Sequence, residues 1–298
     1  MPLPILGLHH VTSKSSDPRG TDRFWREAVG LRRIKQTVNF DNPSVYHLYY
    51  GNEAADPGTV MTYFPFPGLS RGSRGTGEVG SVAFRVAKGS LDLWEARLEA
   101  AGAGEIFRDT WFGEDGLGFE APDGDRFRLI ANAKGGGGAV TGFHSACLTL
   151  EDTAATATIL AAFGYRQEAV EGAVTRFRLV RGNGADVIDL EAAPDLPKAV
   201  EGAGSVHHIA FAVRDRAAQD EVREAMLDMG QRVTHVYDRD YFHAIYFRTD
   251  GGVLFEVATY APGFAVDEDR AHLGESLRLP KQHEHRRAEL FETLVPLD

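Results

Sequence analysis

A unit of about 60 residues occurs four times in this chain, and this repeat constrains the fold more than any other feature. Each unit reads as a strand, an amphipathic helix and then three strands. The predicted helices end near a glycine, a residue suited to closing a helix, and they cover 22–30, 91–102, 153–164 and 219–230. The last strand of each unit is apolar, at 59–64, 126–131, 187–192 and 253–259. The repeat therefore predicts an α+β protein of four βαβββ modules.

The run Gly135–Gly138 separates the second unit from the third and reads as a flexible linker. It divides the chain into an N-terminal half, 1–134, with modules one and two, and a C-terminal half, 139–262, with modules three and four. Residues 263–298 follow the last unit, and we expect them to form an extension that packs on the modules.

The composition excludes several kinds of partner. The chain has 298 residues, 43% of them hydrophobic, and a net charge of −11, which argues against nucleic acid and anionic membranes as partners. Its single cysteine, Cys147, excludes an intrachain disulfide framework and fits a reducing, cytoplasmic environment. The first residues lack the pattern of a signal peptide, and no apolar run approaches the length that spans a bilayer. The sequence leaves open whether the chain forms a homo-oligomer.

Two first strands carry the same dipeptide at the same place, His9-His10 in unit one and His207-His208 in unit four. The last strand of unit four contains a single carboxylate, Glu256, among apolar residues. A buried carboxylate is costly unless it is paired or binds a cation. Two imidazoles and one carboxylate with open positions form the set of ligands that non-haem Fe(II) enzymes use. Because successive side chains of a strand point to opposite faces, only one histidine of each pair is expected to face a metal.

Four such units with ligand-type residues on first and last strands resemble the vicinal oxygen chelate superfamily. That resemblance implies the glyoxalase/bleomycin resistance/dioxygenase fold, in which paired modules curl into open barrels around a metal. The stretches 35–43 and 46–51, with residues around Gly263-Phe264, Asp267-Glu268 and 273–275, are similar to the hydroquinone-type ring-cleaving dioxygenases. This branch implies Fe(II), with Mn(II) as the alternative, and an aromatic diphenol and O2 as the small-molecule partners.

The family pattern places the metal ligand directly before Val-Thr or Ile-Ala, which selects His10 and His208, with Glu256 as the third ligand. The same resemblance implies that His9 and His207 do not bind the metal themselves but form hydrogen bonds that support the ligands. Thr12 shares the face of His10 and is within reach of substrate.

A second motif resembles that of extradiol dioxygenases, in which a histidine precedes an aliphatic-tyrosine pair, a tight turn and a glutamate. Ile245-Tyr246, Gly252 and Glu256 match this motif, while Asp250 replaces its proline and Arg239 replaces its histidine. The resemblance implies that Tyr246 donates a hydrogen bond or a proton near the metal, and that Arg239 binds an anionic substrate.

One competing ligand lies in unit three. Laying the repeats over one another matches His10 and His208 with Ser81 and His144, and Glu256 with Thr62, Arg128 and Asp189. Ligands from units three and four would be His144, His208 and Glu256, whereas the branch resemblance favours His10. If His10 is the ligand, modules one and four must form one barrel and modules two and three the other.

These observations predict a metal-dependent dioxygenase that opens the ring of a hydroquinone or related diphenol with O2. Two alternatives use the same fold. A glyoxalase-type isomerase or lyase would use Ni or Zn and commonly needs a second carboxylate, which Thr62 does not supply. A non-catalytic protein that binds an aromatic drug would not require three metal-ligand residues.

Overall fold

The computed structural model describes residues 2–132 and 138–297, and it contains the four predicted modules. Module one comprises β1 (Leu8–Ser15), α1 (Pro18–Arg23) with a following π-helical turn (Phe24–Val29), β2 (Arg32–Val38), β3 (Tyr46–Gly51) and β4 (Val60–Pro65). Module two comprises β5 (Glu78–Ala87), α2 (Leu91–Ala100), β6 (Gly104–Trp111), β7 (Glu114–Glu120) and β8 (Arg126–Asn132).

The second half of the chain repeats this order. Module three comprises β9 (Phe143–Leu150), α3 (Ala154–Ala162), β10 (Tyr165–Glu171), β11 (Val174–Leu179) and β12 (Val187–Ala192). Module four comprises β13 (Val206–Val213), α4 (Arg216–Asp228), β14 (Tyr237–Asp238), β15 (Phe242–Arg248) and β16 (Leu254–Pro262). The extension holds three short 3₁₀ turns (Phe264–Val266, Arg270–His272 and Lys281–Arg286) and α5 (Arg287–Thr293).

The modules pair as the His10 hypothesis requires. One sheet has the strand order β14-β15-β16-β13-β1-β4-β3-β2 and joins modules four and one. The other has the order β10-β11-β12-β9-β5-β8-β7-β6 and joins modules three and two. At the centre of each sheet two first strands run antiparallel, β1 beside β13 and β5 beside β9. The predicted α+β fold is confirmed, and we call the two curled sheets the first and the second barrel.

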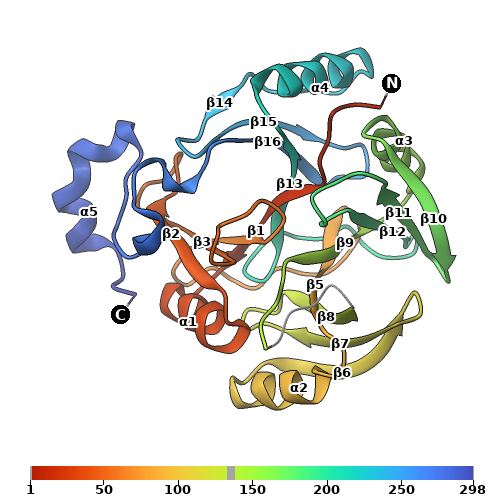
Figure 1. The fold of residues 1–298 in the computed structure, drawn as a ribbon, viewed down its shortest axis with the longest axis horizontal. Coiled ribbons are helices and arrows are strands. Elements are labelled where there is room, and N and C mark those ends of the chain that lie inside the picture. Colours follow the sequence, from red (N-terminus) through yellow and green to blue (C-terminus); the bar gives the residue numbers. More distant parts are fainter. Residues whose placement is uncertain (1, 133–137, 298) are drawn as a thin grey trace.

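The helices lie outside the curled sheets (Figure 1). α4 shows why a helix forms here: Asp215 caps its first turn by accepting a hydrogen bond from the amide of Ala218, and Gly230 follows its end with a φ of 81°. Its buried residues Val222 and Met226 lie one turn apart and face the sheet.

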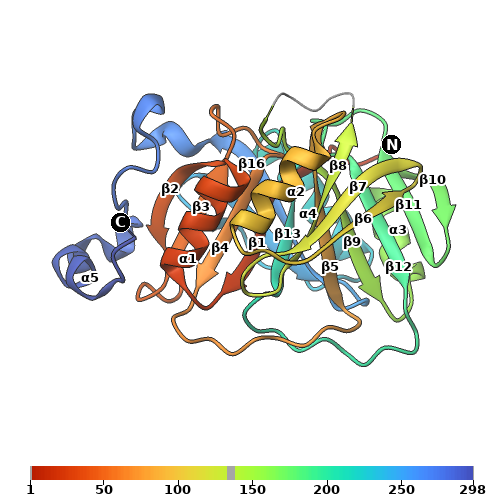
Figure 2. The ribbon, with the colours of Figure 1, turned by 90° about the horizontal axis from the view of Figure 1, so that it is seen from below.

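The two halves of the chain are interlaced, because each half gives one module to each barrel. The connections 66–77 and 193–205 run side by side along one end of the molecule (Figure 2), where Ser73 and Thr76 exchange backbone hydrogen bonds with residues of 197–200. Most of the predicted linker, Gly135–Gly138, lies outside the described residues, and the division into units at 1–134, 139–262 and 263–298 stays a prediction.

The extension closes the free edge of β2. Lys35 is fully buried and pairs with Asp267, at 2.7 Å, and with Glu268. Gln36 of β2 forms a bridge with Leu277. Gly274 lies against the carbonyl of Arg33 with a φ of 75°, where a side chain would clash. No helix in the described part of the chain is long and apolar enough to cross a membrane.

Candidate metal centre

His10, His208 and Glu256 converge in the interior of the first barrel, from β1, β13 and β16. The two Nε2 atoms are 3.2 Å apart, and they lie 3.3 and 2.8 Å from one carboxylate oxygen of Glu256. All three residues are at least 96% buried. Among the described residues they form the one cluster of three metal-ligand side chains. Ligand bonds of about 2.1 Å, at angles of about 90–110°, place ligand atoms roughly 3.0–3.4 Å apart, so the cluster is close to the spacing that a bound cation imposes.

The Glu256 carboxylate needs a positive partner. Neither of its oxygens has a well-formed hydrogen bond within the described part of the protein. Burial would raise its pKa, but the neighbouring His10 and His208 hold the pKa well below its usual range, so the group is ionised. A buried ionised carboxylate without donors is strongly disfavoured. The donor set therefore fits a divalent cation, with nitrogen and oxygen ligands.

Both His-His dipeptides lie in β-bulges, which sequence reasoning missed. Between Leu8 and His10 strand β1 advances two residues while β13 advances one, so His9 is an extra residue. Between His208 and Val206 the roles of the strands are exchanged, and His207 is extra. The premise of strict alternation fails at these places because a bulge re-aims the side chains beside it.

Each bulge histidine contacts the ring that it precedes. The Nδ1 atoms of His9 and His10 are 2.9 Å apart, and those of His207 and His208 are 2.7 Å apart. Burial lowers the pKa of both His9 and His207 to about 3, so both rings are neutral. A neutral bulge ring can accept the Nδ1–H of its neighbour, and this tautomer leaves the Nε2 lone pair of His10 or His208 free for a cation.

Tyr246 and Arg239 lie beside the three-residue cluster, on the side that Glu256 occupies. Tyr246 of β15 stands directly opposite Glu256 in the strand register. Arg239 donates a hydrogen bond from Nε to the Tyr246 hydroxyl at 3.3 Å, and its guanidinium lies over the rings of Phe40 and Tyr237 at 5.1 and 4.8 Å. Burial raises the pKa of Tyr246 well above its usual value, so its hydroxyl keeps its proton.

Thr12 begins a chain of hydrogen-bonded polar groups on the side of the cluster away from Glu256. Its hydroxyl is 2.7 Å from that of Thr62, which is 3.0 Å from Nε2 of His47, and Nδ1 of His47 is 2.9 Å from the Tyr49 hydroxyl. His47 and Tyr49 alternate along β3, and the sequence alone does not distinguish a cavity residue from one that only packs the strand. Laying the repeats over one another could have found Tyr49, because it stands opposite Thr62 as Tyr246 stands opposite Glu256.

A cavity of about 430 Å³, a volume that accommodates a single aromatic ring, adjoins the cluster. His47 and Tyr49 line it, whereas Thr12 and Thr62 are not among its lining residues. Its aromatic lining comes from Phe40, Phe64, Phe66, Phe242 and Tyr237. The polar lining outside the cluster comes from Lys14, Asn39, Asp41, Asn42, His47, Tyr49, His207, Thr234, Arg239 and Tyr246. The stretch 39–42, which carried part of the family resemblance, thus lies at the cavity.

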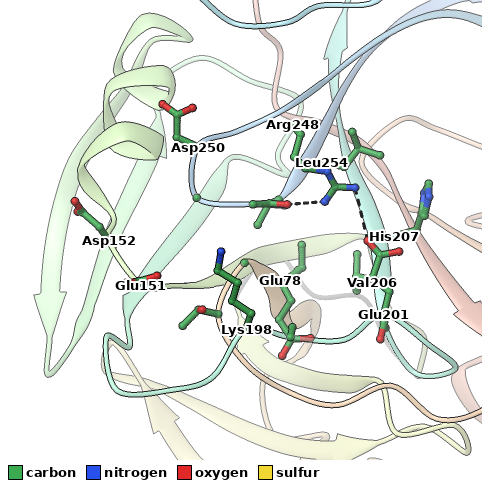
Figure 3. A pocket seen from close by; sticks show the side chains of 18 of the residues that line it. Glu78, Glu151, Asp152, Lys198, Glu201, Val206, His207, Arg248, Asp250 and Leu254 are labelled. Carbon is green, nitrogen blue, oxygen red and sulfur yellow. Dashed lines mark hydrogen bonds and ion pairs between the residues drawn. The ribbon is translucent and has the colours of Figure 1, made fainter.

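A second cavity of about 440 Å³ adjoins His207 (Figure 3). Its walls carry both signs of charge, including Glu78, Lys198 and Arg248. It contains neither His10, His208 nor Glu256, and the two cavities share only His207 and Leu254 among their lining residues. The ring of His207 therefore borders two compartments.

His144 does not belong to this centre, and its predicted position in the repeat was wrong by one residue. Between Ser145 and Phe143 strand β9 advances two residues while β5 advances one, so His144 is the bulge residue. It corresponds to His9 and His207, and Ser145 occupies the ligand position. The His144 ring contacts the Ser145 hydroxyl at 3.1 Å and Glu114 at 2.8 Å, inside the second barrel.

The geometry defines a class: a barrel of paired βαβββ modules around a two-histidine, one-carboxylate cluster. No family model matches the chain. The chain is 39% identical over 98% of its length to a Bacillus subtilis protein provisionally named ring-cleaving dioxygenase MhqE, of which it covers 99%. It is 32% identical to chlorohydroquinone/hydroquinone 1,2-dioxygenase of Sphingobium indicum, over 99% of the chain and 97% of that protein.

Solved structures agree with these sequence relatives. A crystal structure of a provisionally named Bacillus subtilis dioxygenase superposes with a TM-score of 0.94 at 38% identity and covers 99% of this chain and 98% of that one. Glyoxalase I from Zea mays, at 14% identity and a TM-score of 0.66 over 85% of this chain and 92% of that one, shares the fold alone. The chain belongs to the family of these ring-cleaving dioxygenases. It is an oxidoreductase that incorporates O2.

Proposed function

We propose that this protein cleaves the aromatic ring of a hydroquinone or related diphenol, with His10, His208 and Glu256 holding Fe(II). The observation that carries the proposal is the buried carboxylate of Glu256. Within the described part of the protein it has no well-formed hydrogen bond, and the Nε2 atoms of two imidazoles face it. The hydroquinone 1,2-dioxygenase among the relatives indicates the substrate class. Mn(II) prefers similar ligands and is the alternative cation.

A redox-capable cation in this cluster would lower the pKa of a phenol, bring phenolate and O2 together and let electron density pass between them. The protein's own residues orient the reactants. The permanent charge of Arg239 favours an anionic substrate, and Tyr246 keeps a proton that it can donate. Phe242, whose ring centroid is 5.2 Å from that of His10, helps to exclude water from the cluster.

The two alternatives fit less well. An isomerase or lyase of the glyoxalase type would use a second carboxylate, and the position related to Glu256 within this barrel holds Thr62. A protein that merely binds an aromatic drug has no need of the ionised Glu256. We also infer a cytoplasmic location from the single, buried Cys147.

Oxygen uptake tests the proposal. Protein purified anaerobically should contain close to one equivalent of Fe or Mn, and the Fe(II) form should consume one O2 for each hydroquinone opened. The metal-free and Zn(II) forms should consume none. Turnover of a glutathione hemithioacetal by the Ni or Zn form, without oxygen uptake, would instead support the isomerase.

Tyr246 and Arg239 give a second test on the same assay. Tyr246→Phe should lower kcat by on the order of 10²–10³, the usual cost of a well-placed hydrogen-bond donor, with metal content and Tm near wild type. Arg239→Ala should mainly raise KM, because it removes the charge that attracts an anionic substrate. Unchanged kinetics in both variants would show that the two residues are structural.

A further inference from the structure

The two modules of the first barrel place equivalent residues around the ligands. Glu256 pairs in register with the residue two positions after His208, and Thr62 pairs with the residue two positions after His10. Across the next strand, Tyr246 stands opposite Glu256 and Tyr49 stands opposite Thr62. A local two-fold relation therefore exchanges His10 with His208, Glu256 with Thr62, and Tyr246 with Tyr49.

This relation indicates which side of the cluster is open. Only one of the two related positions carries a carboxylate. The other carries Thr62, whose short side chain is engaged at 2.7 Å by Thr12 and at 3.0 Å by His47. The side of the cluster related to Glu256 thus has no ligand from the described residues, and Tyr49 flanks that side as Tyr246 flanks Glu256.

The polar chain at this open side is held firmly. His47 is 93% buried and both of its ring nitrogens have partners, Thr62 and Tyr49. Within the described part of the chain the Tyr49 hydroxyl has one hydrogen-bond partner, Nδ1 of His47, and a phenol can form a second bond. Tyr49 also packs edge-on against Phe264 at 5.3 Å, which fixes the ring against the extension. Both His47 and Tyr49 line the cavity.

We propose that Tyr49 contacts the substrate, with its hydroxyl bonded to the diphenol oxygen that occupies the open side, and that His47 positions Tyr49 for this bond. The inference rests on the proposed function, since it takes a diphenol as the ligand. Thr12 does not itself contact the substrate in this proposal. It contributes indirectly, because its hydroxyl bonds the Thr62 hydroxyl, which in turn bonds His47.

Anaerobic binding separates this role from catalysis, because hydroquinone does not turn over without O2. Full-length protein loaded with Fe(II) would be titrated with hydroquinone by calorimetry, beside metal analysis and thermal melting. Tyr49→Phe should weaken hydroquinone binding by about 10-fold, the scale of one hydrogen bond, with full metal content. Tyr50→Phe is the matched control: it removes the next hydroxyl of β3, which bonds Asp22 outside the cavity, and should leave the affinity for hydroquinone unchanged.

His47 supplies the test of positioning. His47→Leu should weaken hydroquinone binding as Tyr49→Phe does, and His47→Gln should restore much of it because the amide keeps a donor and an acceptor. If Tyr49→Phe, fully loaded with metal, binds hydroquinone as wild type does, the inference is wrong while the proposed function stands. If wild-type protein neither binds hydroquinone nor consumes O2 with it, the proposed function fails and this inference falls with it.

Discussion

The two barrels have the same strand order and the same bulges, yet they treat their interiors differently. The first barrel presents ligand-type groups at three of its four equivalent positions, which hold His10, His208, Glu256 and Thr62. The equivalent positions of the second barrel hold Ser81, Ser145, Asp189 and Arg128. Only the first barrel has therefore kept a set that can bind a transition metal.

The second barrel satisfies its buried carboxylate from within. Asp189 is fully buried, accepts two hydrogen bonds from Arg176 at 2.8 Å and a third from the Trp111 indole at 2.9 Å. Arg176 occupies the position that Tyr246 holds in the first barrel. In the second barrel the Arg176 guanidinium takes the place that a bound metal ion would have in the first. The same architecture thus gives a structural ion pair in one barrel and a candidate metal centre in the other.

The largest expected contrast comes from removing these two carboxylates. Glu256→Gln should abolish stoichiometric metal binding and lower dioxygenase activity by about 10³-fold or more, because it removes the only charged ligand. Asp189→Asn should keep full metal content. Elemental analysis and oxygen uptake measure both. Metal loss in His144→Ala together with full metal in His10→Ala would overturn the assignment of the ligands to modules one and four.

A stability measurement sharpens the contrast. Arg176→Leu leaves the charge of Asp189 buried and without its main partner, and should lower the free energy of unfolding by about 3–5 kcal/mol. The double variant Arg176→Leu/Asp189→Leu should recover most of this loss, because no unpaired charge remains. Urea unfolding measures the difference. Equal stability of the two variants would show that the ion pair does not set the stability of the second barrel.

The repeat made the fold and the module pairing predictable. The hydrophobic periodicity recurs in every module, and the paired histidines occupy the same strand position in modules one and four. The bulges were not predictable, since an extra residue in one strand leaves no mark on the pattern of hydrophobic residues. The extra residue in each bulge shifts the strand register by one. This shift explains why the sequence placed His144 in the ligand position, and why His9 and His207 were expected to point away from the metal ligands.

The cavity wall contributed by β3 was missed for another reason. His47 and Tyr49 are residues that any packed strand accommodates, and their meaning comes from the partners Thr62 and Thr12 across the sheet. The structural role of the buried Lys35 likewise depends on partners far along the chain, Glu268 and Asp267 of the extension.

Asp125 connects the barrels and gives a pH-dependent prediction. It lies between β7 and β8 of the second barrel and accepts hydrogen bonds from Ser13 and Tyr63 of the first, at 2.5 and 3.2 Å. Burial raises its pKa from 3.8 to about 6. Between these pH values the folded state binds more protons than the unfolded state, so this group makes the protein less stable as pH rises through that window.

Asp125→Asn should remove that contribution. Relative to wild type, the variant should gain on the order of 3 kcal/mol of stability between pH 4 and pH 7, since about two pKa units at about 1.4 kcal/mol each are involved. Urea unfolding of both proteins at the two pH values gives the difference. A difference that does not change with pH would mean that Asp125 is ionised throughout this range.

The smallest effect concerns the bulge histidines, and it compares three copies of one feature. His9→Phe and His207→Phe each remove the ring that contacts a ligand histidine at Nδ1, and should weaken metal binding by about 10–100-fold. The loss should be larger for His9, whose ring is 98% buried and donates to the Thr259 carbonyl. His207 borders the second cavity (Figure 3), from which water can reach and replace its hydrogen bond. His144→Phe, the same change in the second barrel, should leave metal affinity unchanged in a chelator competition. A comparable loss from His144→Phe would mean that the bulge substitutions act through the fold and not through the ligands they contact.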